Sequence, residues 1–152
     1  MQIHQITSLF HNDILICALV AWLIAQGLKV PIYWWVEKEL NWQRFFGSGG
    51  MPSSHSAFVV AVGLMVGIRV GFESPEFAIC FVLAAIVMYD AAGVRRETGT
   101  QATIINQIIR DVLINGKPIS DEELKELVGH TPLEVLAGAI VGVLTTLAFI
   151  IR

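Results

Sequence analysis

The chain has 152 residues, of which 55% are hydrophobic and only 15% charged, with a formal net charge of -3 at pH 7. A soluble domain of this length is normally less apolar, so the composition excludes an ordinary water-soluble fold. The ten basic residues are scattered and outnumbered by thirteen acidic ones, which excludes a nucleic-acid-binding surface. We predict a single, all-α integral membrane domain over residues 1–152.

Four apolar segments are predicted to be transmembrane helices, because a spanning helix needs about 20 residues. The third has the shortest apolar run, and the four cover about 14–31, 53–72, 77–94 and 132–151. The first helix is expected to be retained, since the residues before Asp13 lack the Lys and Arg of a cleavable signal. Cys17 and Cys80 fall inside apolar runs and are expected to be packed as free thiols.

The sequence Glu73-Ser74-Pro75-Glu76 predicts a tight hairpin between the second and third helices, with Ser74 as N-cap and Pro75 in the first helical position. A polar insert, 95–130, then separates the third helix from the fourth. Within it, 100–113 has isoleucines at helical spacing opposite polar residues, which predicts an interfacial amphipathic helix. A second short helix is predicted to start at Ser120.

Basic residues flanking the helices predict the orientation in the membrane. The loops after the first and third helices share one side and hold eight of them, against Arg69 and Arg152 on the other. Without three arginines that are candidate site residues, five remain against two. Both termini are therefore predicted outside the cell membrane and both long loops in the cytoplasm. The eight residues are Lys29, Lys38, Arg44, Arg95, Arg96, Arg110, Lys117 and Lys125.

The start of the second helix has the features of an anion-binding site. Its first backbone N–H groups lack helical partners, and Gly49 and Gly50 allow a ligand to approach the backbone closely. Ser53 and Ser54 add hydroxyl donors, although Ser53 could equally serve only as a helix cap. His55 favours a functional site, because an ionisable residue at the mouth of a membrane helix is costly.

The start of the fourth helix carries a second histidine. Thr131, Pro132 and Glu134 form a predicted capping box, with Thr131 as N-cap. That box does not account for His130. A carboxylate four residues away can orient the imidazole and stabilise its protonated form, which makes the other ring nitrogen a better nucleophile. Glu134 can cap and orient at once.

Arginines are predicted on the same side as these two helix starts. Arg95 and Arg96 follow the third helix, and Arg44 precedes the glycine turn. Guanidinium groups and helix N-termini together hold the equatorial oxygens of a phosphoryl group and neutralise their charge. The alternative for the arginine pair is anchoring to anionic lipid headgroups. Asp90 is expected to pair with one of these arginines.

At these residues the chain resembles the phosphatidic acid phosphatase type 2 and vanadium haloperoxidase superfamily, and most closely its small divergent branch. Pro52-Ser53-Ser54-His55 is similar to the Pro-Ser-Gly-His motif of that superfamily. His130-Thr131-Pro132-Leu133-Glu134 is similar to its final His-x-x-x-Asp motif. The run from 44 to 101 resembles the divergent branch specifically, so the resemblance covers nearly the whole chain.

The resemblance implies a phosphohistidine mechanism without metal or other cofactor. His130 would attack phosphorus, Glu134 would orient it and His55 would protonate the leaving alkoxide. The phosphate oxygens would be held by Ser53, Ser54, Lys38, Arg44 and one or both of Arg95 and Arg96. Three residues depart from the superfamily pattern: Ser54 replaces a glycine, Glu134 an aspartate and Leu124 an arginine. The spacing of Lys38 and Arg44 is also one residue shorter than in that pattern.

The leading hypothesis is an integral-membrane phosphatase that hydrolyses a phosphate or pyrophosphate monoester of a membrane lipid at the cytoplasmic face. The first alternative is a non-enzymatic protein that binds or transports a phosphorylated lipid with the same basic pocket. The second is a metal site built from His55, His130, Glu134 and Asp90, which nearby arginines disfavour. Trp34 and Trp35 suit an interfacial aromatic belt. Several glycines are spaced for close packing between helices, either within one protomer or in a homo-oligomer. They are Gly63, Gly67, Gly71, Gly138 and Gly142.

Overall fold

The computed structural model describes residues 8, 10–45, 50–93, 101, 105 and 131–151. These residues form helices and their connections, without strands, which agrees with the predicted all-α fold. The elements in chain order are α2 (Asp13–Glu37), the short 3-10 helix η1 (Trp42–Phe45), α3 (Ser54–Val70), α4 (Pro75–Ala92) and α6 (Pro132–Ile151).

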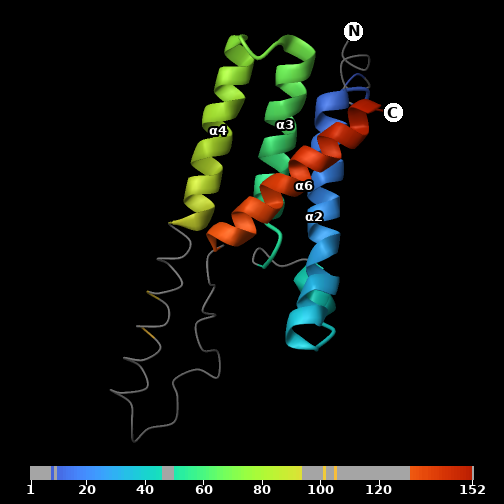
Figure 1. Cartoon of the computed structure of the whole chain (residues 1–152), viewed down its shortest axis with the longest axis vertical. Coiled ribbons are helices and arrows are strands. Elements are labelled where there is room, and N and C mark those ends of the chain that lie inside the picture. Colours follow the sequence, from blue (N-terminus) through green and yellow to red (C-terminus); the bar gives the residue numbers. More distant parts are fainter. Residues whose placement is uncertain are drawn as a thin grey trace, which may run out of the picture.

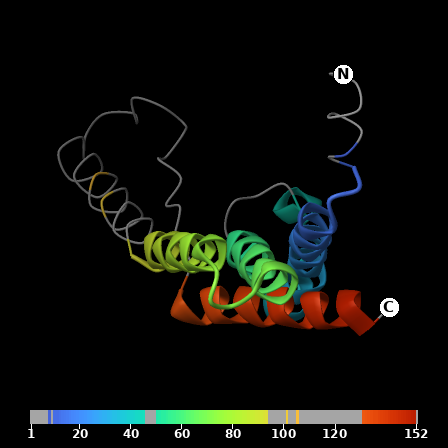
Figure 2. The same cartoon turned by 90° about the horizontal axis from the view of Figure 1, so that it is seen from above.

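The four long helices form two layers. α4, α3 and α2 lie side by side in that order, and α6 crosses one face of this layer and contacts all three (Figures 1 and 2). The start of α2, the end of α6 and the α3–α4 hairpin share one end of the molecule (Figure 1). The starts of α3 and α6 therefore lie towards the opposite end, where the candidate site is built.

Three helices are long and apolar enough to cross a membrane: α2, α4 and α6. The third predicted span is thus long enough, contrary to the expectation that it would be the short one. The second span is shorter than predicted, because α3 has only 17 residues. Gly71 ends it with a positive φ of 120°, so Phe72 lies outside the helix. Three candidate spans are therefore established, and a fourth crossing by α3 stays a prediction.

The first helix is longer than the sequence predicted. The segment was expected to end near Pro31, but α2 continues through that proline to Glu37. A proline inside a membrane helix is tolerated where neighbouring groups satisfy the backbone that it frees. The helix ends at Lys38, which adopts a left-handed φ of 59° and donates its N–H to the Trp34 carbonyl.

Small residues let the helices approach one another closely. The core is formed mainly by alanines of α2 and α3, with Cys17 and Met65. On α6, a Cβ at Gly142 would lie 2.6 Å from the Ala57 carbonyl oxygen, so α3 already occupies that face. Gly63 similarly faces the side chain of Cys80. Packing within one protomer accounts for these glycines, while homo-oligomerisation stays a prediction.

The predicted hairpin between the second and third helices is confirmed. The Ser74 hydroxyl accepts a hydrogen bond from the Phe77 N–H at 3.1 Å, and Pro75 occupies the first turn of α4. Phe72 packs edge to face on Phe77, with ring centroids 5.0 Å apart. Of the insert 95–130, including the helix predicted from Ser120, only residues 101 and 105 are described, and both are helical and exposed.

Candidate functional site

The starts of α3 and α6 meet, as the sequence predicted. The Ser53 N–H donates a hydrogen bond to the main-chain carbonyl of Glu134 at 2.9 Å. One turn further along α6, Gly138 lies against the Ser53 carbonyl, where a Cβ would collide with the backbone. This contact joins the cap of one helix directly to the first turns of the other. Two positive helix ends therefore converge on one small region.

The predicted capping box of α6 is confirmed. The Thr131 N–H donates to the Glu134 Oε2 at 3.0 Å, and the Glu134 N–H donates to the Thr131 Oγ1 at 3.3 Å. Glu134 is half-buried, so its second carboxylate oxygen has room for another partner. His130 lies outside the described residues, so its predicted orientation by Glu134 stays a prediction.

The two neighbouring serines of the second motif have different environments. Ser53 is completely buried, and its hydroxyl accepts hydrogen bonds from the Ser56 N–H at 3.3 Å and the Ser56 Oγ at 3.0 Å. It is therefore the N-cap of α3. Ser54 is 3% exposed, and within the described part of the chain its hydroxyl makes no hydrogen bond. Of the two serines that were predicted as phosphate ligands, Ser54 is the one whose hydroxyl is available.

His55 lies in the first turn of α3 and is exposed, whereas both its neighbours, Ser54 and Ser56, are buried. The imidazole is therefore displayed at the surface of the bundle beside the α3 start. An exposed imidazole in the first turn is accessible to a substrate, which the predicted general acid requires.

A buried lysine lies at this site and was not predicted from the sequence as a site residue. Lys29 was counted among the loop residues, but it lies inside α2 and is only 2% exposed. Its ammonium group interacts electrostatically with Glu134 at the start of α6. Gln26, one turn earlier on α2, is also buried, and its Nε2 donates to the Phe45 carbonyl. The useful signal was the helical spacing that places both residues beside the buried alanines Ala18, Ala21 and Ala25.

The other predicted site residues are distributed as follows. Lys38 is exposed at the C-cap of α2, nine residues beyond Lys29. The Arg44 backbone belongs to η1, but its side chain, like all of Arg95 and Arg96, lies outside the described residues. Asp90 is half-buried in the last turns of α4. The structure therefore joins Glu134 to the α3 start and places Lys29 within electrostatic range of Glu134, and it leaves the arginine contacts as predictions.

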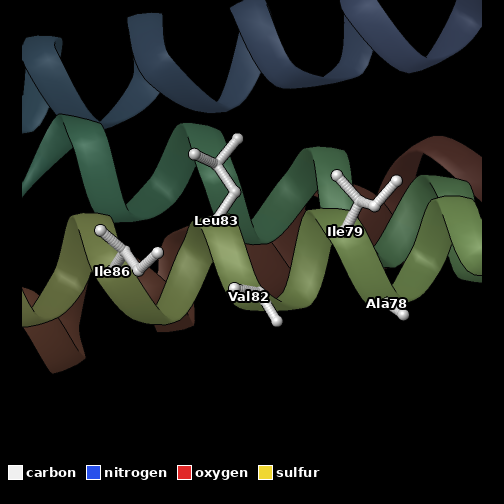
Figure 3. Close-up of a pocket in the computed structure, with 5 residues that line it drawn as sticks. All are labelled: Ala78, Ile79, Val82, Leu83 and Ile86. Carbon is white, nitrogen blue, oxygen red and sulfur yellow. The ribbon is translucent and has the colours of Figure 1, made fainter.

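A shallow groove elsewhere on the bundle has a different chemistry. It runs along α4 and is lined only by apolar side chains, as Figure 3 shows. Such a lining offers neither charge nor hydrogen-bond donors to a phosphate, and suits contact with lipid chains. It is distinct from the polar site and comprises Ala78, Ile79, Val82, Leu83 and Ile86.

Comparison with known proteins identifies the relatives of this chain. The model of the divergent PAP2 family matches residues 10–145, most of the chain and both helix starts of the site. The chain belongs to the divergent PAP2 family. Its membership confirms the resemblance that the two histidine motifs indicated. No solved structure matches the chain.

A membrane protein of Bacillus subtilis (strain 168), the uncharacterized membrane protein YuiD, is 41% identical over 150 residues. That alignment covers 92% of this chain and 95% of the relative. Together with the three long apolar helices, it makes this divergent PAP2 protein a multi-helix membrane protein.

Proposed function

We propose that this protein is an integral-membrane lipid phosphatase that removes a terminal phosphate from a phosphorylated or pyrophosphorylated lipid. The observation that carries the proposal is the convergence of two helix starts beside a buried lysine in a protein related to the PAP2 phosphatases. Helix N-termini and a cation together suit the charge of a phosphoryl group in transfer.

In the proposed mechanism, His130 attacks phosphorus and a P–N bond forms as the P–O bond to the lipid breaks. The leaving oxygen takes a proton from His55, and the product departs as the lipid alcohol from a monophosphate or as the lipid monophosphate from a pyrophosphate. Water then attacks the phosphohistidine, releases inorganic phosphate and restores His130. Glu134 holds the imidazole of His130. His55 gives a proton to the leaving group in the first step and, as a base, takes one from the attacking water in the second.

The phosphate would be held by groups that contribute differently. Ser54 and the α3 backbone supply hydrogen-bond donors, and Lys29 supplies a charge close to Glu134. Arg44, Arg95 and Arg96 remain proposed ligands from the loops. Lys38 contributes less in this account, because it lies exposed nine residues further along α2.

The site is proposed to face the cytoplasm, on the basis of charge asymmetry. Because Lys29 is buried inside α2, it no longer counts as a loop residue. Without Lys29 and the three candidate site arginines, four basic residues remain on the predicted cytoplasmic side, against two on the other. The excess keeps its sign, and the predicted orientation, with both termini outside, is retained in the proposal.

The test is phosphate release by purified protein from vesicles that contain a diacylglycerol phosphate, a prenyl pyrophosphate or, as a phosphodiester control, phosphatidylcholine. We expect His130→Ala to reduce release by about 10³-fold or more, since a lost nucleophile removes the covalent route. His11→Ala, an exposed histidine near the start of α2, is the matched control and should retain activity. Labelled phosphate should be trapped on His130.

Equal release by the His130→Ala variant and the unmodified protein would contradict the mechanism. Tight binding of the phosphorylated lipids without release of phosphate would instead identify the non-enzymatic binding protein.

A further inference from the structure

One ion pair fixes a common level for α2 and α3. Asp13 in the first turn of α2 and Arg69 in the last turn of α3 are joined at 2.8 Å. An α-helix rises about 1.5 Å per residue. Lys29, sixteen residues after Asp13, therefore lies about 24 Å from this level, and Ser54, fifteen residues before Arg69, lies about 22 Å from it. The buried lysine and the α3 start are at nearly the same depth.

The tryptophans of α2 mark where the membrane surface lies. A hydrocarbon core about 30 Å thick corresponds to about 20 helical residues, which extends from Asp13 to Tyr33. Trp34 and Trp35 follow immediately and are 54% and 72% exposed, as expected for an interfacial aromatic belt. Lys29 and the α3 start therefore lie about 6 to 8 Å below this belt, inside the apolar slab.

After Lys38 the chain turns back into that slab, as the position of η1 shows. Beyond the left-handed Lys38, η1 packs against α2, and the Phe45 carbonyl accepts the hydrogen bond from Gln26 (Figure 1). Gln26 is eight residues before Trp34, or about 12 Å deeper along the helix. Even with the reach of a glutamine side chain, η1 lies below the belt. Non-helical backbone is tolerated at such depth only when protein buries it or it lines a water-filled cavity.

The exposed His55 distinguishes these two possibilities. It is fourteen residues before Arg69, about 21 Å from the ion pair, and so lies as deep as Lys29. Ionisable side chains at membrane depth face the bundle interior or water, because exposure to lipid is costly. His55 is not buried in the bundle.

We infer that residues 38–45 form a re-entrant arm beside a water-filled recess, which has Lys29 and the α3 start at its floor and takes a terminal phosphate group below the membrane surface. The inference rests on the proposed function for its ligand, but requires no hydrolysis. It also explains why α3 has only 17 residues: the helix starts inside the membrane, at the floor of the recess.

The recess also selects among headgroups. A phosphate that must descend about 6 to 8 Å below the belt carries with it any group attached on its water side. A choline or similar substituent would then leave water for the narrow, polar floor, whereas an unsubstituted phosphate would bring only its own charge. The expected ligand is therefore a terminal phosphate, either of a lipid or free in solution.

The test is thiol labelling in permeabilised vesicles, in a Cys17→Ala, Cys80→Ala background, with a charged and water-soluble methanethiosulfonate reagent. His55→Cys should react at least about 10-fold faster than Leu28→Cys, because only water carries the reagent. Leu28 is the matched control, since it has the same depth on α2 and belongs to the exposed stripe that continues to Trp35. Phe45→Cys, on the re-entrant arm, provides a second reporter should His55→Cys fail to fold.

Equal labelling rates at the reporters and at Leu28→Cys would overturn the recess. Inorganic phosphate or vesicles of phosphatidic acid should slow the labelling of His55→Cys, and phosphatidylcholine vesicles should not. Protection by phosphate alone identifies a soluble ligand, and protection by phosphatidic acid alone a lipid. Absence of protection by either, or equal protection by phosphatidylcholine, would overturn recognition of a terminal phosphate. Labelling does not depend on turnover, so these outcomes are separate from failure of the phosphatase proposal.

Discussion

Of the four long helices that the structure describes, two start at each end of the bundle, and a hydrogen bond joins the two starts at one of these ends. α2 and α4 start at the end that holds the hairpin, and α3 lies between them (Figure 1). At the opposite end, the starts of α3 and α6 are connected by the hydrogen bond from Ser53 to Glu134. A single helix start is a common structural feature, whereas two in contact concentrate positive potential on one spot.

The two ends also differ in the acidic residues that occupy the first turns of their helices. Asp13 and Glu76 occupy the first turns of α2 and α4, and the pair of Asp13 with Arg69 is half exposed. At the opposite end, Glu134 occupies the first turn of α6, but the first turn of α3 carries no acidic residue, and Lys29 is buried. The hairpin end compensates its helix dipoles with its own carboxylates, while the α3 start leaves its positive potential for a ligand.

The largest expected effect is the difference in stability between a variant of the buried Lys29 and a variant of the exposed Arg69. Lys29→Met removes a buried ammonium group that interacts electrostatically with Glu134, and it should lower the free energy of unfolding by about 3 kcal/mol, the cost of leaving the partners of a buried charged group unsatisfied. Arg69→Met breaks an exposed pair and should cost at most about 1 kcal/mol. Unfolding in mixed detergent micelles measures both.

Adding Glu134→Gln to Lys29→Met provides the control for this comparison. If the loss arises from an uncompensated charge, the double variant should recover part of the stability lost in Lys29→Met. Additive losses would show that Lys29 and Glu134 are energetically independent.

A smaller effect is expected from filling the contact between α3 and α6. A methyl group at Gly138 would collide with the Ser53 backbone, so Gly138→Ala should destabilise the protein by about 1 to 3 kcal/mol. Gly27→Ala is the matched control, because no atom lies within 4 Å of a Cβ there. It should stabilise α2 by about 0.5 to 1 kcal/mol. Thermal unfolding of the two variants in the same detergent would measure the difference, and equal midpoints would contradict the close approach.

The smallest effects should resolve the neighbouring serines. Ser53→Ala removes the α3 cap and should cost about 1 kcal/mol, as should Ser74→Ala at the α4 start. Ser54→Ala should leave stability within about 0.5 kcal/mol while weakening the binding of orthovanadate by about 5-fold, the loss of one hydrogen bond. Vanadate titration of the three variants checks this ordering. Weaker binding in Ser74→Ala than in Ser54→Ala would contradict it.

Local signals predicted much of this arrangement. Ser74 before Pro75, and Thr131 three residues before Glu134, were sufficient to locate two helix starts, because a cap is a contact between near neighbours in sequence. For Ser53 and Glu134, the sequence predicted only that both lie on the same side of the membrane, and not that they are in contact. Its hydrogen bond depends on the tertiary crossing of α3 and α6, which Gly138 permits.

Lys29 and Pro31 misled sequence reasoning for related physical reasons. A proline usually ends a helix, so the first span was predicted to end near Pro31, and Lys29 was counted among the basic residues that flank the spans. Inside a bundle, neighbouring groups can satisfy the freed backbone, and the buried Lys29 interacts electrostatically with Glu134 from a distant part of the chain. Neither compensation is local in sequence.

The central claim is that a phosphate binds where α3 and α6 start, beside Lys29. Its most direct test is the affinity of the purified protein for orthovanadate, compared between Lys29→Met and Arg69→Met. Loss of a charged hydrogen bond of about 1.5 to 3 kcal/mol corresponds to a dissociation constant about 10- to 150-fold higher in Lys29→Met, with Arg69→Met unchanged. Equal affinities in the two variants would contradict the claim.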